Sequence, residues 1–157
     1  ETGKDFEENA ILKAKNAFTK TNISSVGDDS GLIVPAINNE PGLYSARYAG
    51  LNATDSDNRN KLISKLKDNK LESTYAYFFC CIVAVGIKGQ NEIIVCDGKV
   101  EGEVRTIERG EKGFGYDPMF YPKGYSESFA ELNSLEKNKI SHRGQALKKL
   151  MDKLNKT

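Results

Sequence analysis

The sequence lacks tryptophan altogether and is poor in histidine and cysteine, two of the residue types from which metal centres are built. Its one histidine is His142, and its three cysteines, Cys80, Cys81 and Cys96, lie in apolar runs rather than at regular ligand spacings. An odd number of cysteines in such runs indicates buried free thiols. We therefore expect a protein of a reducing compartment, the cytoplasm, that needs no disulfide to fold.

Long apolar runs and an excess of charge of one sign are also missing. The longest apolar run, YAYFFCCIVAVGI at 75–87, is too short to span a bilayer as a helix, and no charged-then-apolar signal segment opens the chain. Lysine and arginine, 23 together, almost balance aspartate and glutamate, 22 together. The overall charge gives no reason to expect a nucleic acid or a membrane as partner, so any bound anion must be held by a local cluster.

Helical periodicity occurs in three segments of a chain whose length, 157 residues, suits a single domain over 1–157. The first segment, at about 5–20, has apolar residues four positions apart: Phe6, Ala10, Ala14 and Phe18. The second begins at a capping residue, Thr54 or Asp55, and contains three apolar side chains: Leu62, Ile63 and Leu66. The third, at about 143–155, buries five: Ala146, Leu147, Leu150, Met151 and Leu154.

Strand patterns lie between the second and third helices. The run STYAYFFCCIVAVGI, 73–87, is apolar on both alternating faces, which is typical of a strand covered on both sides. The following run, 91–107, contains two strand patterns separated by Asp97-Gly98, a dipeptide suited to a tight reversal. The sequence thus predicts an α/β fold in which helices flank a mixed sheet.

The segment GDDSGL, 27–32, places two adjacent carboxylates between glycines, which predicts a turn. One interpretation is a solvated turn with a capping aspartate. The other is a metal site, because Asp28 and Asp29 at one strand end would offer hard oxygen ligands to Mg²⁺. The segment alone does not decide between the two.

The segment GEKGFGYDPMFYPKG, 110–124, is too aromatic for an ordinary surface loop. It can fold its aromatic rings onto the core. It can also form a pocket for a flat heterocycle, with Phe114 as the stacking face and Asp117 as the acceptor for a ring N–H.

A third segment, EKNKISHRGQALKKL at 136–150, brings Lys137, His142 and Arg143 within two turns. A solitary histidine near a lysine-rich helix end is commonly structural or solvated. The alternative is a nucleotide-binding cluster, since arginine carries a planar fork of donors that suits ring carbonyls or phosphates.

Five segments, in their order and spacing, resemble the inosine/xanthosine triphosphate pyrophosphatase family: ETGKDFEENAILKAKNAF, GDDSGLIV, EPGLYSARYAG, GFGYDPMF and EKNKISHRGQALKKL. The resemblance implies an elongated α/β fold with a mixed, strongly twisted central sheet and two lobes with an active-site cleft between them. It implies Mg²⁺-dependent hydrolysis of ITP, dITP and XTP to the monophosphate and pyrophosphate. It also implies a homodimer.

The same resemblance assigns roles to particular residues. Asp29 matches the family's general base and metal ligand, with Asp28 as a second acidic contributor. Ten residues match substrate contacts: Lys13, Ser30, Arg47, Phe114, Gly115, Tyr116, Asp117, Lys137, His142 and Arg143. Among these, Lys13 resembles a lysine that reaches the phosphates, the segment 114–117 binds the base, and Lys137, His142 and Arg143 read the purine.

The resemblance is incomplete at the front of the chain. Members of the family begin with a buried strand, a phosphate-binding turn, a helix and an acidic metal ligand, and none of these precedes the segment that starts at Glu1. We therefore expect a processed or partial chain of reduced activity. Two other interpretations stay open: a nucleotide-binding remnant without hydrolysis, and an RNA-binding domain that stacks bases on its aromatic loop.

Overall fold

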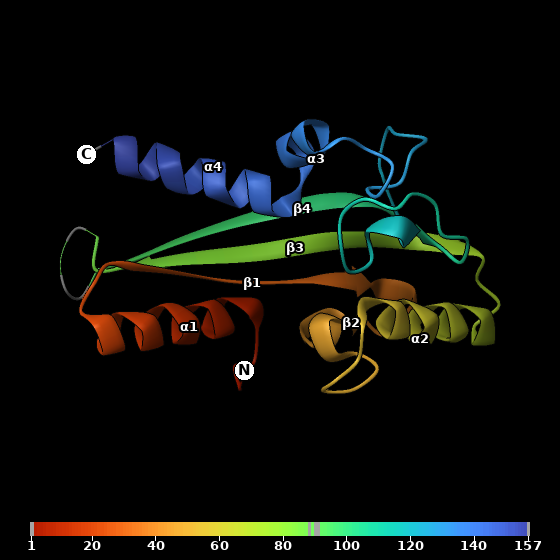
Figure 1. The fold of residues 1–157 in the computed structure, drawn as a ribbon, viewed down its shortest axis with the longest axis horizontal. Helices are drawn as coiled ribbons and strands as arrows, with labels where there is room; N and C mark the ends of the chain where they lie inside the picture. Colours follow the sequence, from red (N-terminus) through yellow and green to blue (C-terminus); the bar gives the residue numbers. More distant parts are fainter. Residues whose placement is uncertain (1, 88, 90–91, 157) are drawn as a thin grey trace. The chain divides into compact units, whose positions relative to one another are not determined.

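The computed structural model describes residues 2–87, 89 and 92–156, which form helices and one five-stranded sheet (Figure 1). The helices are α1 (Phe6–Thr21), α2 (Asp55–Asp68), α3 (Ser134–Ile140) and α4 (His142–Asn155). The strands are β1 (Ser25–Val34), β2 (Glu40–Pro41), β3 (Ser73–Val85), β4 (Ile93–Arg105) and β5 (Phe120–Pro122), in the sheet order β2-β1-β3-β4-β5. Within the described ranges, none of the helices has the length and apolar character needed to cross a membrane.

The three predicted helices are confirmed, and each begins at a side-chain cap. The Asp5 carboxylate accepts from the amide of Glu8 at the start of α1. Thr54 and Asp57 form a reciprocal capping box at the start of α2. The Ser141 hydroxyl accepts from the amide of Gly144 at the start of α4.

The predicted α/β class with flanking helices is confirmed, while the strand directions differ from the mixed sheet that both the strand patterns and the resemblance led us to expect. β1 pairs antiparallel with β2, with Ile33 opposite Pro41, and β4 pairs antiparallel with β5, with Val104 opposite Phe120. The five described strands form an antiparallel sheet.

The predicted reversal at Asp97-Gly98 is wrong, because β4 runs through both residues without a break. The glycine at position 98 is explained by a contact with α4. A Cβ at this position would lie 1.9 Å from the carbonyl oxygen of His142 in the first turn of α4. The glycine therefore allows the backbone of a helix to approach the backbone of a strand.

The chain divides into two compact units, in agreement with the two lobes that the resemblance implied. Unit 1 comprises Glu1–Ser30, Phe79–Lys99 and Ser141–Thr157, and unit 2 comprises Gly31–Phe78 and Val100–Ile140. β1, β3 and β4 each contribute residues to both units. We describe each unit by itself.

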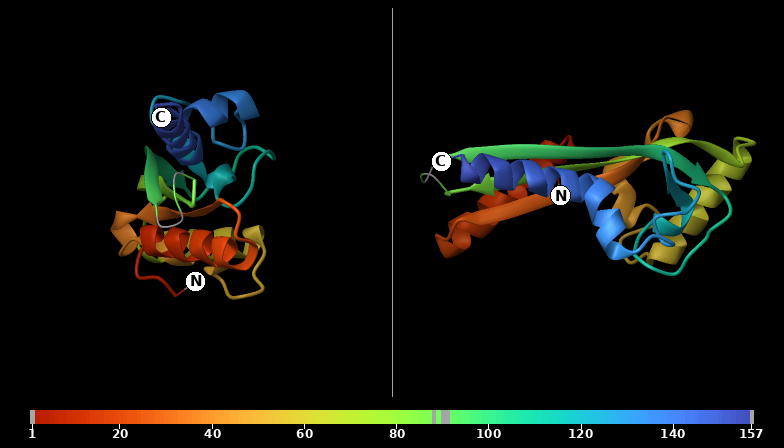
Figure 2. Two further views of the ribbon diagram at one scale, coloured as in Figure 1. Left: turned by 90° about the vertical axis from the view of Figure 1, so that its left-hand side faces the viewer. Right: turned by 90° about the horizontal axis from the view of Figure 1, so that it is seen from above.

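In unit 1, alternate side chains of β3 pack against different helices. One set lies in a cluster with α4: Cys80, Ile82 and Ala84 with Ala146 and Leu150. The other set lies in a cluster with α1: Cys81, Val83 and Val85 with Ala10 and Ala14. Figures 1 and 2 show α1 and α4 on opposite faces of the strands. The prediction of a strand covered on both sides is thus confirmed.

The same packing confirms the prediction of buried free thiols, since Cys80, Cys81 and Cys96 are all free and buried. Loss of solvent raises the pKa of Cys80 from 9.0 to about 12. Two other burial predictions are wrong, because Leu147 and Met151 of α4 are exposed. They lie one residue after Ala146 and Leu150, so they occupy the neighbouring stripe of the helix surface.

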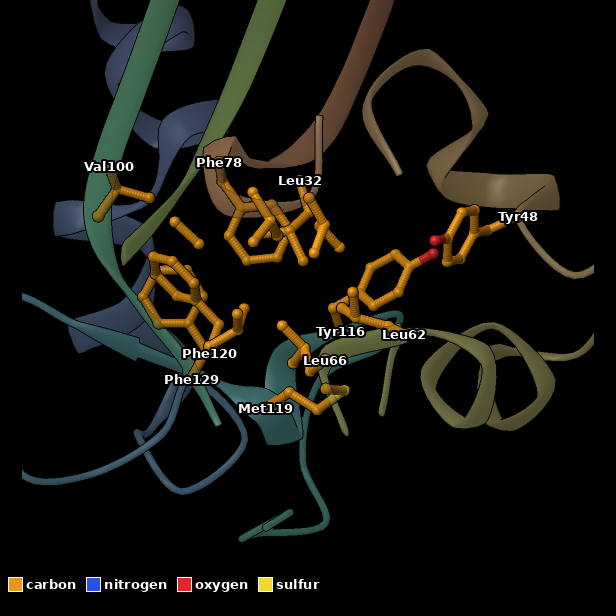
Figure 3. Packing of buried hydrophobic residues seen from close by; sticks show 14 residues of the cluster. Leu32, Tyr48, Leu62, Leu66, Phe78, Val100, Tyr116, Met119, Phe120 and Phe129 are labelled. Atoms are coloured by element: carbon orange, nitrogen blue, oxygen red, sulfur yellow. The ribbon is translucent and has the colours of Figure 1, made fainter. Parts of the chain in front are cut away.

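In unit 2, aromatic side chains dominate the core (Figure 3). The ring of Phe120 lies with its centroid 4.7 Å from that of Phe78 and 5.0 Å from that of Phe129. Leu62 and Leu66 reach this cluster from α2. The predicted alternative in which segment 110–124 folds aromatic rings onto the core therefore holds for Phe120.

The close approach at Gly98 predicts a large effect of a small substitution. Gly98→Ala should lower the free energy of unfolding by about 1–3 kcal/mol, since the helix backbone cannot move aside without disturbing the Cys80 cluster. Urea denaturation followed by circular dichroism measures this. Gly89→Ala is the control, because a Cβ there would meet nothing within 4 Å. Equal stabilities of the two variants would refute the explanation.

Candidate functional site

The predicted turn at GDDSGL is wrong, because residues 27–32 lie within β1. The glycine that suggested a turn is explained by a helix contact: a Cβ at Gly27 would lie 2.6 Å from the backbone of Ala10 and Ala14 in α1. Side chains alternate along a strand, so Asp29 shares the α1 face with Gly27 whereas Asp28 faces the other way. The two adjacent carboxylates are therefore separated by the sheet itself.

Asp29 is a buried carboxylate, 7% exposed, held by two residues of α1. Lys13 donates from Nζ to Asp29 Oδ1 at 3.0 Å and to the Asp28 carbonyl oxygen at 2.9 Å. Asn9 donates from Nδ2 to Asp29 Oδ2 at 3.0 Å. Because Asn9 and Lys13 are four residues apart, they lie on one face of the helix, and each donates to a different oxygen of the Asp29 carboxylate.

Asn9 was not predicted as a site residue, although it is only 2% exposed. Its Oδ1 accepts from the amide of Gly3 at 2.8 Å, which fixes the orientation of its side-chain amide. The sequence does show that Asn9 and Lys13 are polar residues four positions apart, next to the apolar stripe of the helix. Such a pair does not reveal its partner strand.

Asp28 contacts the beginning of α4 instead. Arg143 donates from Nε to Asp28 Oδ2 at 3.1 Å, and both side chains are partly exposed. The neighbouring His142 is buried. Ser30 follows on the same face of β1 as Asp28 and is partly buried.

A metal ion that needs Asp28 and Asp29 together does not fit this placement, because their side chains lie on opposite faces of β1. Among residues 2–87, 89 and 92–156, no group of three or more histidine, cysteine, aspartate or glutamate side chains is arranged to hold a metal. The Asp29 carboxylate by itself still offers hard oxygen donors of the kind that Mg²⁺ prefers.

The second group of predicted site residues belongs to unit 2. Asp117 is 3% exposed; its Oδ2 accepts from the amide of Phe114 at 2.9 Å and pairs with Nζ of Lys137. The same ammonium lies 4.7 Å from the centroid of the Phe114 ring. Gly113 is required beside them, because its φ is +75° and a Cβ would lie 2.0 Å from Asp117 Oδ2.

Phe114 is 60% exposed, in contrast to the other aromatic residues of this segment. Tyr116 is buried, and its hydroxyl donates to the carbonyl oxygen of Ser45 at 2.7 Å. Burial raises the pKa of this hydroxyl well above its usual value. Both interpretations of the segment therefore apply, since Tyr116 belongs to the core and Phe114 presents its ring to solvent.

The predicted cluster of Lys137, His142 and Arg143 is divided by Ser141. Lys137 lies in α3 of unit 2, whereas His142 and Arg143 open α4 in unit 1. The Ser141 side chain caps α4, so a new helix starts between Lys137 and His142. Arg47 ends a short 3₁₀ helix, Gly42–Arg47, with its guanidinium carbon 5.2 Å from the centroid of the Tyr44 ring.

Gly115 is held by two residues that were not predicted. Its amide donates to Asp55 Oδ2 at 2.8 Å, and its carbonyl oxygen accepts from Arg59 Nη1 at 2.9 Å. Both partners lie on α2, 60 and 56 residues away along the chain.

Comparison with known proteins shows close similarity over almost the whole chain. The family model described as the Ham1 family matches residues 1–153. A dITP/XTP pyrophosphatase of Idiomarina loihiensis is 48% identical over 156 residues, which cover 99% of this chain and 77% of that protein. A dITP/XTP pyrophosphatase of Bacillus anthracis is 46% identical over 154 residues, with 98% and 76% covered.

Solved structures are similar to the same extent. A HAM1 protein from Coxiella burnetii superposes with a TM-score of 0.92 at 42% identity and covers 100% of this chain and 80% of its own. The Ham1 protein of Staphylococcus aureus superposes with a TM-score of 0.89 at 44% identity, with 99% and 79% covered. The chain thus spans about three quarters of the length of the relatives that it matches.

The buried pair of Lys137 and Asp117 generates a stability prediction. Lys137→Met should lower the free energy of unfolding by about 3 kcal/mol, because it leaves a buried carboxylate without its counter-charge. Adding Asp117→Asn should recover most of that loss. Urea titrations of the single and double variants measure both effects.

Lys139→Met is the matched control, since Lys139 is an exposed lysine of the same helix and should change stability by less than about 0.5 kcal/mol. If Lys137→Met is as stable as this control, the ion pair between Lys137 and Asp117 does not stabilise the fold as we expect.

Proposed function

The chain belongs to the Ham1 family, and from this premise we propose that it hydrolyses non-standard purine nucleoside triphosphates, ITP, dITP and XTP, to the monophosphate and pyrophosphate. The observation that carries the proposal is the 48% identity to a dITP/XTP pyrophosphatase over 99% of the chain. Such an enzyme removes non-standard nucleotides from the precursor pool.

We assign the reaction with water to the Asp29 group of unit 1. In this hydrolysis, a water oxygen forms a bond to the α-phosphorus, and the bond from that phosphorus to the bridging oxygen breaks, so that pyrophosphate leaves. Asp29 would take the proton of the water as general base. Each Asp29 oxygen already accepts one hydrogen bond, from Asn9 or Lys13, which fixes the carboxylate while leaving acceptor capacity.

Phosphate binding is assigned to Lys13, whose ammonium is partly exposed beside Asp29. We also propose that the enzyme uses Mg²⁺ and that Asp29 binds the ion. Asp28 would not bind the same ion from this strand, because its side chain lies on the opposite face of β1. When bound, the ion would neutralise phosphate charge.

We assign base recognition to the exposed Phe114 ring, to the polar side chains that contact its segment in unit 2, and to the first residues of α4 in unit 1. In unit 2, the exposed ring of Phe114 would stack on the purine, and Asp117 and Lys137 would meet its polar edge. In unit 1, His142 and Arg143 would donate to the 6-keto oxygen. Ser30, Arg47, Gly115 and Tyr116 complete the proposed substrate contacts, with Tyr116 acting from within the core.

The proposal extends to the setting of the enzyme. Three buried free thiols support a reducing compartment such as the cytoplasm. The homodimer that the resemblance implied is also part of the proposal.

The experiment that tests this function compares ITP and ATP as substrates, with pyrophosphate release as the readout. We expect kcat/KM for ITP to exceed that for ATP by at least about 100-fold. The 6-amino group of adenine is a hydrogen-bond donor, so in ATP it would face the donors of His142 and Arg143 and leave them unpaired. Arg143→Ala should lower the ratio of kcat/KM for ITP to kcat/KM for ATP. Lys148→Ala, which removes an exposed charge from the same helix, should leave that ratio unchanged.

Comparable kcat/KM values for ATP and ITP would reject the proposed function. Binding of ITP without pyrophosphate release would favour the nucleotide-binding alternative, and tighter binding of single-stranded RNA than of ITP would favour the RNA-binding alternative.

A further inference from the structure

We propose that Asp55 and Arg59 of α2 are positioning residues for base recognition, which clamp the backbone of Gly115 on both sides and so position the neighbouring Phe114. The inference rests on the proposed function, because it takes Phe114 as the surface on which the purine stacks. We call residues 113–117 the base loop. All residues of the clamp and of the base loop belong to unit 2.

The clamp addresses both polar groups of one residue. The amide of Gly115 donates to Asp55 Oδ2 at 2.8 Å, while its carbonyl oxygen accepts from Arg59 Nη1 at 2.9 Å. Gly115 can offer both groups to the same helix because its φ of +60° turns the backbone into the left-handed region. Both hydrogen bonds involve a charged partner, and such bonds are stronger than neutral ones.

The two clamp residues lie on one face of one helix. Asp55 is the first residue of α2, and Arg59 follows four residues later, so their side chains point to the same side. Arg59 is oriented in addition by Glu108, whose Oε1 accepts from its Nε at 2.5 Å.

An arginine suits this position better than a lysine. The guanidinium makes two contacts in different directions with one rigid fork, to Glu108 and to Gly115. The single ammonium of lysine lacks that planar geometry. The clamp therefore depends on the shape of the donor as well as on its charge.

The clamp completes the support of Phe114 from its C-terminal side. Within the loop, the amide of Phe114 donates to Asp117, which fixes the loop to its own buried carboxylate. Gly115 is the next residue, and its contacts anchor the loop to α2. When the backbone that carries an exposed aromatic residue is held at both of these points, it is ordered before substrate arrives, and less entropy is then lost on binding.

The test uses Asp55→Ala and Arg59→Lys in steady-state hydrolysis of ITP. A loosened loop should raise KM by about tenfold, since a hydrogen bond to a charged group is lost, while kcat changes by less than about twofold. Asp55→Asn retains an acceptor for the Gly115 amide and should restore KM to within about threefold of the wild type.

Asp57→Ala is the matched control. It removes the two hydrogen bonds that Asp57 Oδ2 accepts from the amide and the hydroxyl of Thr54, and it does not touch Gly115, so it should leave KM unchanged while it lowers the unfolding temperature. A KM that rises equally in Asp57→Ala and Asp55→Ala would overturn the clamp, because the effect would then follow helix stability.

Amide hydrogen exchange of the base loop gives a readout that does not depend on catalysis. The Gly115 amide should exchange at least about tenfold faster in Asp55→Ala than in the wild type, and at the wild-type rate in Asp57→Ala. Unchanged exchange in Asp55→Ala overturns the clamp even if the enzyme hydrolyses ITP. A wild-type protein that releases no pyrophosphate refutes the proposed function, whereas faster exchange in Asp55→Ala still supports the clamp.

Discussion

The alternation of side chains along β1 is the constraint on which the arrangement of the site depends. It directs Asp29 toward α1, where Asn9 and Lys13 hold its two oxygens, and Asp28 toward Arg143 of α4. Two residues that are neighbours in sequence therefore have different partners and different chemistry. Gly27 belongs to the same constraint, because the absence of its side chain lets α1 approach the strand closely enough for Asn9 to reach Asp29.

The helices could be predicted from sequence because the signals that define them are local. The caps at Asp5, Thr54 and Ser141 and the four-residue spacing of apolar side chains set where α1, α2 and α4 begin. The two turns that were predicted inside strands both concern glycine. At 27 and 98, glycine marks the close approach of a helix, which depends on a distant segment, and a local reading takes it for a turn.

Some residues of the candidate site could likewise be predicted from sequence, and others could not. Residues with distinctive chemistry beside a glycine or an aromatic ring, such as Asp29, Phe114 and Asp117, were predicted from sequence. Asn9, Asp55 and Arg59 were not, since a polar residue on a helix gives no sign of which strand or loop it holds. Their importance comes from contacts across 20 to 60 residues, which only the folded chain reveals.

The sheet separates the proposed general base, Asp29, from Asp28, which pairs with Arg143. The most direct measurement is kcat for ITP hydrolysis in two variants, Asp29→Asn and Asp28→Asn, each compared with the wild type at equal folded concentration. We expect Asp29→Asn to lower kcat by at least about 100-fold, since it removes the general base, and Asp28→Asn to retain kcat within about tenfold. A larger loss of kcat in Asp28→Asn than in Asp29→Asn would contradict the account.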